Sequence, residues 1–139
     1  AELRGYLIAK LLWDPQADVE ALTDDFLAGY YGAAGTHLRE YIDSMHDAQA
    51  SPGEGPSIFG HPHTPPQPYL SEDMLARYAA IFDQAEAAVA GDTELLNRVR
   101  YARLPIRYAV LEQAKTRATG EDGLFVKSPD GWGPRPDLL

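Results

Sequence analysis

Apolar residues recur at helical spacing along most of this chain. Leucines repeat at every fourth position from residue 3 to residue 11, and further apolar residues beside them make a wide stripe that ends near Trp13. Pro15 disfavours the helical conformation at the residue before it, Asp14, so the helix stops there. We therefore expect a first helix over Leu3–Trp13, with Trp13 packed in the core.

A second helix follows the Asp-Pro turn. Asp18 offers a side-chain oxygen to the free amides at its start, and apolar residues repeat at helical spacing from Val19 to Tyr30. Gly32 lies where a helix needs a left-handed terminating residue. Residues 34–48 predict a third helix, which returns along the second as a helical hairpin.

The second half of the chain alternates between helical pattern and helix breakers. Residues 50–70 are so rich in proline and glycine that a long loop is expected. Ser71 is a good N-cap for a fourth helix that runs to Gly91. Asp92 caps a fifth helix, which continues past Pro105, where a missing amide and a ring clash should bend it.

The pattern as a whole predicts an all-α fold. We expect about five helices in an antiparallel or orthogonal bundle, with the long Pro/Gly-rich loop and an irregular C-terminal tail. Residues 1–119 would form the helical domain and residues 120–139 the tail. The chain opens without Met and already inside an amphipathic pattern, so we expect it to be a fragment of a longer protein.

Composition narrows the choice of partners. The 139 residues are sufficient for one domain with its own core, and the absence of cysteine excludes disulfides and thiolate metal sites. A net charge of -9 argues against nucleic-acid and anionic-membrane partners, because polyanions would be repelled. No apolar run reaches the roughly 20 residues of a membrane span. We expect no cofactor.

The histidines do not predict a metal site. His61 and His63 would share one side of an extended segment. Zinc needs three or four ligands, however, and His37 and His46 belong to a different element. The preferred interpretation is a loop that reaches a partner or substrate with His61, His63 and Tyr69 as hydrogen-bonding groups.

Five acids between Asp14 and Asp25 raise the question of acid/base catalysis, which needs a pair of carboxylates. Asp14 and Asp18 are better explained as caps near helix starts, while Asp24 and Asp25 lie off the apolar stripe, as solvated groups do. We therefore assign no catalytic residue.

Three arginines and one tryptophan remain as candidate contacts. Arg100, Arg103 and Arg107 form one basic stripe on the fifth helix, interpreted as ion pairs with acids on neighbouring helices. The alternative is that one or more of these arginines binds a carboxylate or the acidic face of a second domain. Trp132, between two glycines, is interpreted as an anchor on the domain, with stacking on a sugar ring as the alternative.

Three blocks of sequence carry a resemblance to a known family: LRGYLIAKLLWDPQADVEALTDDFLAGYYGAAGTHLREYI, YLSEDMLARYAAIFDQAEAAV and RVRYARLPIRYAVLE. Together, over most of residues 2–112, they resemble the C-terminal helical part of domain-of-unknown-function family 4838. Members of that family look like glycoside hydrolases related to the hexosaminidase and alpha-glucuronidase barrels. The resemblance implies a secreted or periplasmic carbohydrate-active protein whose catalytic barrel precedes this chain and supplies its paired acids.

The expected function is that of a non-catalytic helical accessory domain that buttresses the upstream barrel. The first helix, Leu3–Trp13, would then be the last outer helix of the barrel, and the loop 55–69 is a candidate for the rim of its substrate cleft. One alternative is a carbohydrate-binding module that stacks sugars on Tyr30, Tyr31, Tyr69 or Trp132. Another is a protein-interaction domain that uses the arginine stripe.

Overall fold

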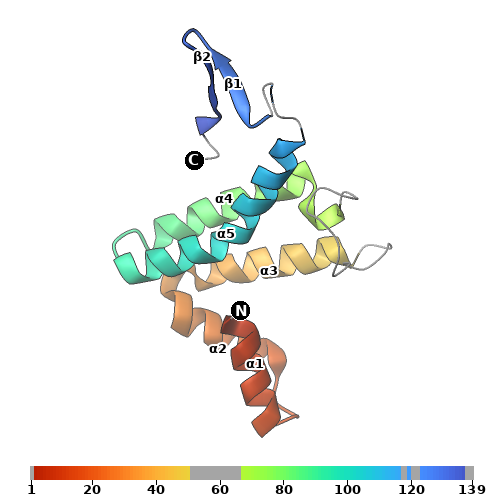
Figure 1. Cartoon of the computed structure of the whole chain (residues 1–139). Coiled ribbons are helices and arrows are strands. Elements are labelled where there is room, and N and C mark those ends of the chain that lie inside the picture. Colours follow the sequence, from red (N-terminus) through yellow and green to blue (C-terminus); the bar gives the residue numbers. More distant parts are fainter. Residues whose placement is uncertain (1, 51–66, 117–118, 120–122, 137–139) are drawn as a thin grey trace. The chain divides into compact units, whose positions relative to one another are not determined.

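The computed structural model describes residues 2–50, 67–116, 119 and 123–136. Figure 1 shows α-helices, two short 3-10 helices (η) and two strands. In chain order they are α1 (Glu2–Trp13), α2 (Val19–Tyr31), η1 (Gly32–Ala34), α3 (Gly35–Gln49), η2 (Pro68–Leu70), α4 (Glu72–Ala88), α5 (Thr93–Lys115), β1 (Phe125–Ser128) and β2 (Gly131–Pro134).

The chain is mostly helical, as predicted, but the all-α class and the irregular tail are wrong. Strands β1 and β2 pair antiparallel in a two-stranded sheet inside the segment 120–139. A tight turn through Pro129 and Asp130 joins them, because proline and aspartate favour turn conformations and Gly131 takes a φ of +121°. The domain boundary after residue 119 stays a prediction.

The predicted helix starts are confirmed at the level of single hydrogen bonds. The side chains of Asp18 and Asp92 each accept two backbone N–H bonds, at 2.9 to 3.2 Å, from the first turns of α2 and α5. Ser71 accepts a longer bond of 3.4 Å at the start of α4. Helix α5 continues through Pro105, as predicted, while the bend at this residue stays a prediction.

The chain divides into two compact units. Residues Ala1–Ser44 and Ala80–Ala102 form unit 1, and residues Met45–Ala79 and Arg103–Leu139 form unit 2. In unit 2, Tyr78 is fully buried and Gln113 donates a 2.8 Å hydrogen bond to the carbonyl of Leu70. Its other buried apolar residues are Leu75, Ile106, Ala109 and Ala114.

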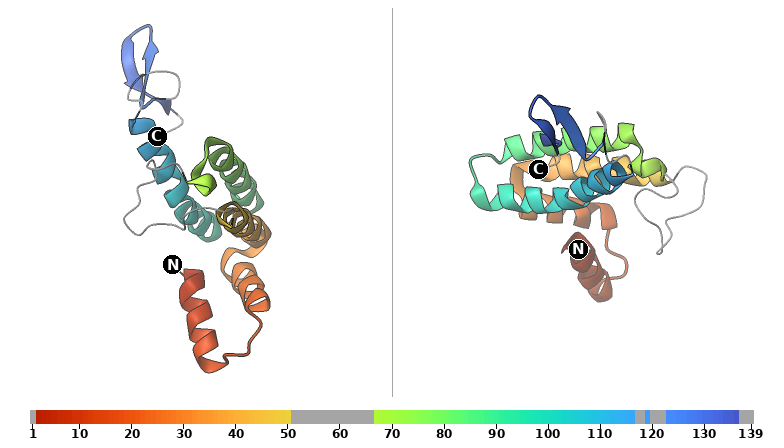
Figure 2. Two further views of the ribbon diagram at one scale, coloured as in Figure 1. Left: turned by 90° about the vertical axis from the view of Figure 1, so that its right-hand side faces the viewer. Right: turned by 45° about the horizontal axis from the view of Figure 1, so that its top comes forward.

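In unit 1, α1 and α2 run antiparallel side by side, and glycines set the joint between α2 and α3 (Figure 2). Gly32 ends α2 with a φ of +56°, as predicted, and its N–H donates to the carbonyl of Ala28. A Cβ on Gly35 would lie only 2.7 Å from the carbonyl oxygen of Leu27. The start of α3 therefore lies against the backbone of α2 at a distance that only glycine permits.

Arg98 fixes the first turns of α5 to the same joint. Its guanidinium donates a 2.8 Å hydrogen bond to the carbonyl of Tyr30 and lies 4.5 Å from the centre of the Tyr30 ring. The same group pairs with Glu94 one turn earlier on α5. One side chain therefore satisfies a carbonyl at the end of α2, where helical carbonyls lose their partners.

Two aromatic residues anchor the core of unit 1. Phe82 is fully buried and packs on Tyr41, with 5.0 Å between ring centres. Tyr31 is buried at the end of α2, and this burial raises the pKa of its phenol to about 12.

We expect Gly35→Ala to destabilise the chain by about 1 to 3 kcal/mol, because the new methyl group meets backbone atoms that cannot rotate away. Gly29→Ala is the matched control, since its Cβ meets no atom within 4 Å and alanine is the better helix former. Urea unfolding of both variants measures the difference. Equal effects of the two substitutions would contradict the close approach of α2 and α3.

We expect the free energy of unfolding to fall between about pH 10 and pH 12. The phenol of Tyr31 ionises near pH 10 in the unfolded chain and near pH 12 in the folded one, so unfolding releases a proton in this window. Tyr31→Phe should remove part of this fall and a step near pH 12 in an absorbance titration of the tyrosines. An unchanged titration in Tyr31→Phe would show that another phenol is responsible.

Candidate functional site

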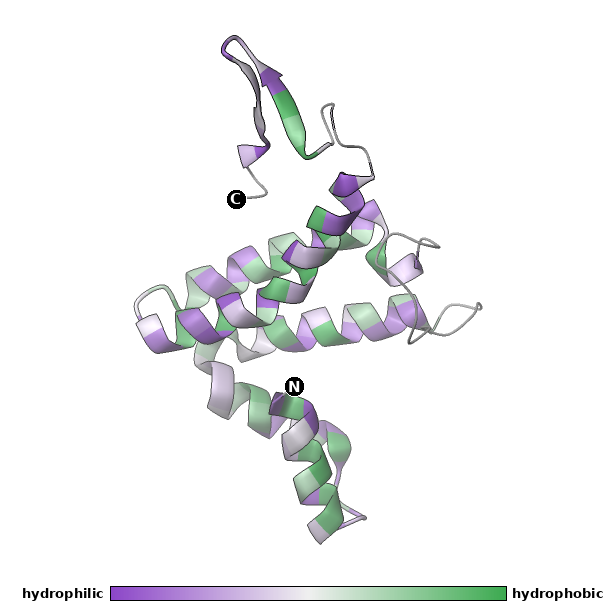
Figure 3. Ribbon diagram, in the orientation of Figure 1, coloured by the Kyte–Doolittle hydropathy of each residue, from purple (hydrophilic) through white to green (hydrophobic). Residues whose placement is uncertain are grey.

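Helix α1 carries apolar residues on two sides, and one of them is exposed. Figure 3 shows hydrophobic residues along most of the helix. None of its described residues is buried, and Ile8, Leu12 and Trp13 are 48, 81 and 92 % exposed. We call the exposed side the outer face of α1; it consists of Gly5, Ile8, Ala9 and Leu12, and the exposed ring of Trp13 adjoins it at the C-terminal end of the helix.

The opposite side of α1 faces α2. There the Tyr6 ring lies 5.3 Å from that of Phe26, and the Tyr6 hydroxyl donates a 2.6 Å hydrogen bond to Asp25. That bond raises the pKa of Tyr6, because the carboxylate accepts from the protonated phenol. Since Leu3, Leu7 and Leu11 are also partly covered, α1 is held by α2 on this side only.

Acids are concentrated in the α1–α2 hairpin. Residues 11–36 contain five acids and no lysine or arginine. Two of these acids, Glu20 and Asp24, pair with Arg39 on α3, which also binds Asp43 of its own helix. These carboxylates hold α2 to α3, and the structural interpretation of the acids is favoured over acid/base catalysis.

The exposure of Trp13 contradicts the prediction that this residue packs in the core. Trp13 ends α1 with its ring in solvent. Asp14 does not start a helix either: it lies in the turn with Pro15, and its Oδ1 accepts from the backbone N–H of Gln16 at 3.0 Å. Val19, expected on the inner side of α2, is also exposed. The Trp-Asp-Pro segment is therefore the exposed tip of the hairpin.

The predicted loop contacts lie mostly outside the described residues. His61 and His63 belong to residues 51–66 and are among those that the structure does not describe. Tyr69 lies in η2 and is partly buried. The predicted loop site therefore stays a prediction, since only Tyr69 of its three residues is described.

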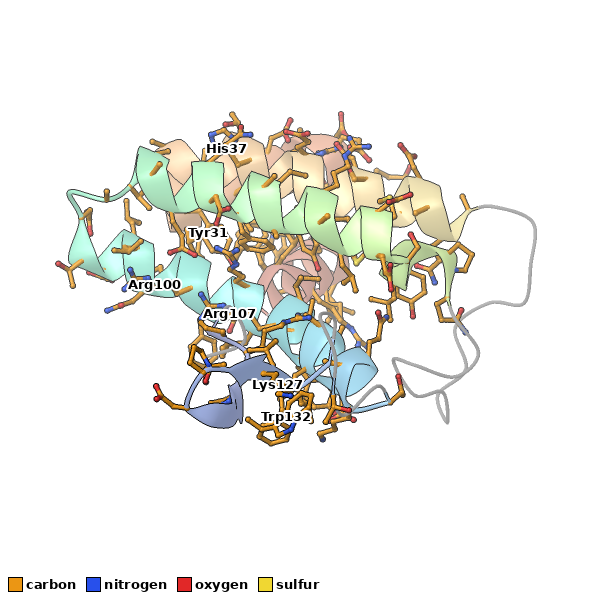
Figure 4. The ribbon with its side chains drawn as sticks, turned by 90° about the horizontal axis from the view of Figure 1, so that it is seen from above. Tyr31, His37, Arg100, Arg107, Lys127 and Trp132 are labelled. Carbon is orange, nitrogen blue, oxygen red and sulfur yellow. The ribbon has the colours of Figure 1, made fainter. Side chains whose placement is uncertain are left out.

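The arginines of α5 are placed separately. In unit 1, Arg100 pairs with Glu86 of α4 at 3.2 Å, the kind of ion pair that was predicted. In unit 2, Arg103 makes a long 3.5 Å contact with the carbonyl of Ala79, and Arg107 is exposed. Figure 4 labels Arg100 and Arg107 among the side chains of α5. A role for these arginines in binding stays a prediction.

The predicted sugar-stacking residues differ in accessibility. Tyr31 is buried, and Tyr30 is covered by Arg98 and stacked on Phe26 at 5.1 Å, so neither offers a free ring face. Trp132 is 58 % exposed on β2. Its interpretation as an anchor on the domain stays a prediction.

The described part of the chain contains neither a cluster of metal-ligating side chains nor a membrane-spanning helix. Within residues 2–50, 67–116, 119 and 123–136, no group of three or more metal-ligating side chains comes together. Among the helices in that part of the chain, none has both the length and the apolar character needed to cross a bilayer.

Residues 1–43 match the model of a family described as Domain of unknown function (DUF4838). The match covers 43 of the 139 residues, from α1 to the Asp43 that pairs with Arg39. It supports the predicted resemblance over this segment alone, and this segment contains the outer face of α1. No curated protein and no solved structure matches the chain.

We expect Trp13→Ala to change the free energy of unfolding of the 139-residue chain by less than about 0.5 kcal/mol, as exposed substitutions do. Phe82→Ala, at a fully buried position, should cost about 3 to 5 kcal/mol. Chemical denaturation measures both. A large loss in Trp13→Ala would mean that the ring is covered within the chain.

Proposed function

We propose that this chain is a non-catalytic helical domain of a glycoside-hydrolase-like, carbohydrate-active protein. It buttresses an upstream catalytic barrel of the same polypeptide by docking the outer face of α1 on it. The observation that carries this proposal is the exposure of Ile8, Leu12 and Trp13. The family match over residues 1–43 supports it, because it lies on the same segment.

The size of the exposed surface favours another protein surface as its occupant. A tryptophan covers about 150 to 250 Å² when buried, and Ile8, Leu12 and Trp13 together leave on the order of 400 Å² of mainly apolar surface exposed. Patches of this size on single proteins are often binding sites. One side of a standard protein interface covers about 800 Å², so the patch would form the apolar centre of such an interface.

The two-sided apolar pattern of α1 favours a helix between two layers. A helix that packs on one neighbour needs one apolar stripe, whereas a helix covered on both sides is apolar on both. Barrel enzymes carry an outer ring of helices on their strands. Helix α1 meets this requirement if α2 covers Tyr6 and the barrel covers Ile8 and Leu12.

The small residues of the outer face favour close packing. A Cβ added to Gly5 meets no atom of the chain within 4 Å, and Ala9 lies one turn away on the same side. Gly5 and Ala9 therefore leave shallow positions beside Ile8 and Leu12, which a partner side chain can fill. Asp14 and Asp18 flank the tip, so the docking surface should carry lysine or arginine near Trp13.

The test compares two equally exposed aliphatic side chains in the longer polypeptide that contains the proposed barrel. Ile8→Asp on α1 and Leu104→Asp on α5 replace side chains that are each 48 % exposed. We expect Ile8→Asp to split a single thermal transition into two and to expose the junction to limited proteolysis, because the charge is buried against the barrel. Leu104→Asp should leave both readouts as in the parent.

Identical behaviour of the two variants would overturn the proposed docking face. Self-association of the 139-residue chain, measured by sedimentation and lost in Ile8→Asp, would assign the face to a second copy instead. Activity of the longer protein toward chromogenic glycosides tests its class separately. Activity retained by the barrel without this chain would confirm that the chain supplies no catalytic group.

A further inference from the structure

The β-hairpin of unit 2 presents a second exposed aromatic surface. In its register Lys127 lies opposite Trp132 and Phe125 lies opposite Pro134. Opposed residues, and residues two apart on a strand, share a face, so these four side chains form one face of the hairpin. All four are exposed, with Trp132 at 58 % and Phe125 at 44 %. We call this the aromatic face of the hairpin.

The other face of the hairpin is the more covered one. Val126 and Gly133, which oppose each other, are both partly buried. At the turn, the hydroxyl of Ser128 donates a 3.0 Å hydrogen bond to the carbonyl of Gly131, which closes the end of the ladder. The aromatic face is thus the one directed to solvent, on a two-stranded element that is marginally stable without a further partner.

The area of the aromatic face fits a small ligand. With about 150 to 250 Å² for a whole aromatic side chain, Trp132 and Phe125 expose on the order of 200 Å² together. A protein partner of standard size needs about 800 Å² on each side. Two exposed aromatic side chains at diagonal positions of the ladder instead match a ligand of one or two six-membered rings.

The charge on the aromatic face selects an anion. Lys127 places an ammonium group, which has three donors and no acceptor, beside the Trp132 ring (Figure 4). Asp130 lies in the turn, outside the four residues of the face, and Arg135 follows β2. A polyanion such as nucleic acid is disfavoured by the net charge of -9, so the favoured ligand is a small anion.

We propose that the aromatic face of the hairpin binds a sugar acid. The pyranose ring stacks on Trp132 with Phe125 beside it, and its carboxylate pairs with Lys127. A ring that carries an anionic group follows from the exposed aromatic side chains and the ammonium group of Lys127, whereas the choice of a sugar acid over another anion of this kind rests on the proposed function. No bond is made or broken, and α1 takes no part in this site.

Nuclear magnetic resonance of the intact chain tests this proposal with a built-in reference. The chain has two tryptophans, so its two indole N–H signals report on Trp132 and, as an internal control, on Trp13. Trp132→Phe assigns the signals. We expect methyl glucuronoside to shift the Trp132 signal saturably without moving that of Trp13, and methyl glucoside to bind about tenfold more weakly, since it lacks the carboxylate.

Variants separate the contributions of the rings and of the charge. Lys127→Gln should abolish the preference for the glucuronoside over the glucoside, and Phe125→Ala should weaken both. Tyr108→Ala, at an exposed aromatic position of α5, is the matched control and should change neither. Backbone amide signals of β1 and β2 in each variant show whether the hairpin is retained.

Three results would overturn the proposal. They are no saturable shift of Trp132 with either sugar, equal binding of glucuronoside and glucoside, and a shift with benzoate but not with the glucuronoside. The last result would assign the face to an aromatic acid. None of them bears on the docking of α1, which the Ile8→Asp and Leu104→Asp pair decides on its own.

Discussion

The close approach of α2 and α3 at Gly35 is the constraint on which unit 1 depends. Because Gly35 has no Cβ, the Leu27 carbonyl can approach it closely. The chain can therefore reverse within the three residues of η1. A Cβ on Gly32 would meet Leu95 at 2.8 Å, and Arg98 binds Tyr30 close by. The end of α2, the start of α3 and the first turns of α5 therefore meet at one tightly packed joint, which fixes the base of the α1–α2 hairpin.

Local signals predicted the helix ends because their physics is local. Asp18 and Asp92 cap the amides two and three residues ahead. Gly32 adopts the positive φ at the end of α2, which glycine tolerates without strain. The hairpin in the tail was missed although its signal is equally local: Ser-Pro-Asp-Gly at residues 128–131 is a turn sequence. The preceding β1 has only four residues, too short for its periodicity to be recognised.

Trp13 could not be placed from the sequence, because burial depends on what covers a helix. At 100° per residue, Ile8 and Leu12 lie on the side of α1 away from Leu3 and Leu7, so the single wide stripe that the pattern predicted consists of two stripes. Read as two stripes, the same residues predict a helix with two neighbours. The described residues supply α2 as one of them. The exposed face of the hairpin was equally hidden, since it needs the register of Lys127 and Trp132.

The two exposed surfaces differ in the binding that their areas can support. At about 25 cal/mol per Å², burial of on the order of 400 Å² on α1 contributes about 10 kcal/mol, and burial of about 200 Å² on the hairpin contributes half as much. Association costs at least about 4 kcal/mol in lost translational and rotational freedom. The outer face of α1 therefore leaves the larger margin over that cost, and in the proposed arrangement a covalent connection to the barrel would lower the cost itself. The aromatic face leaves a smaller margin, so the charge of Lys127 would contribute more to the proposed choice of ligand.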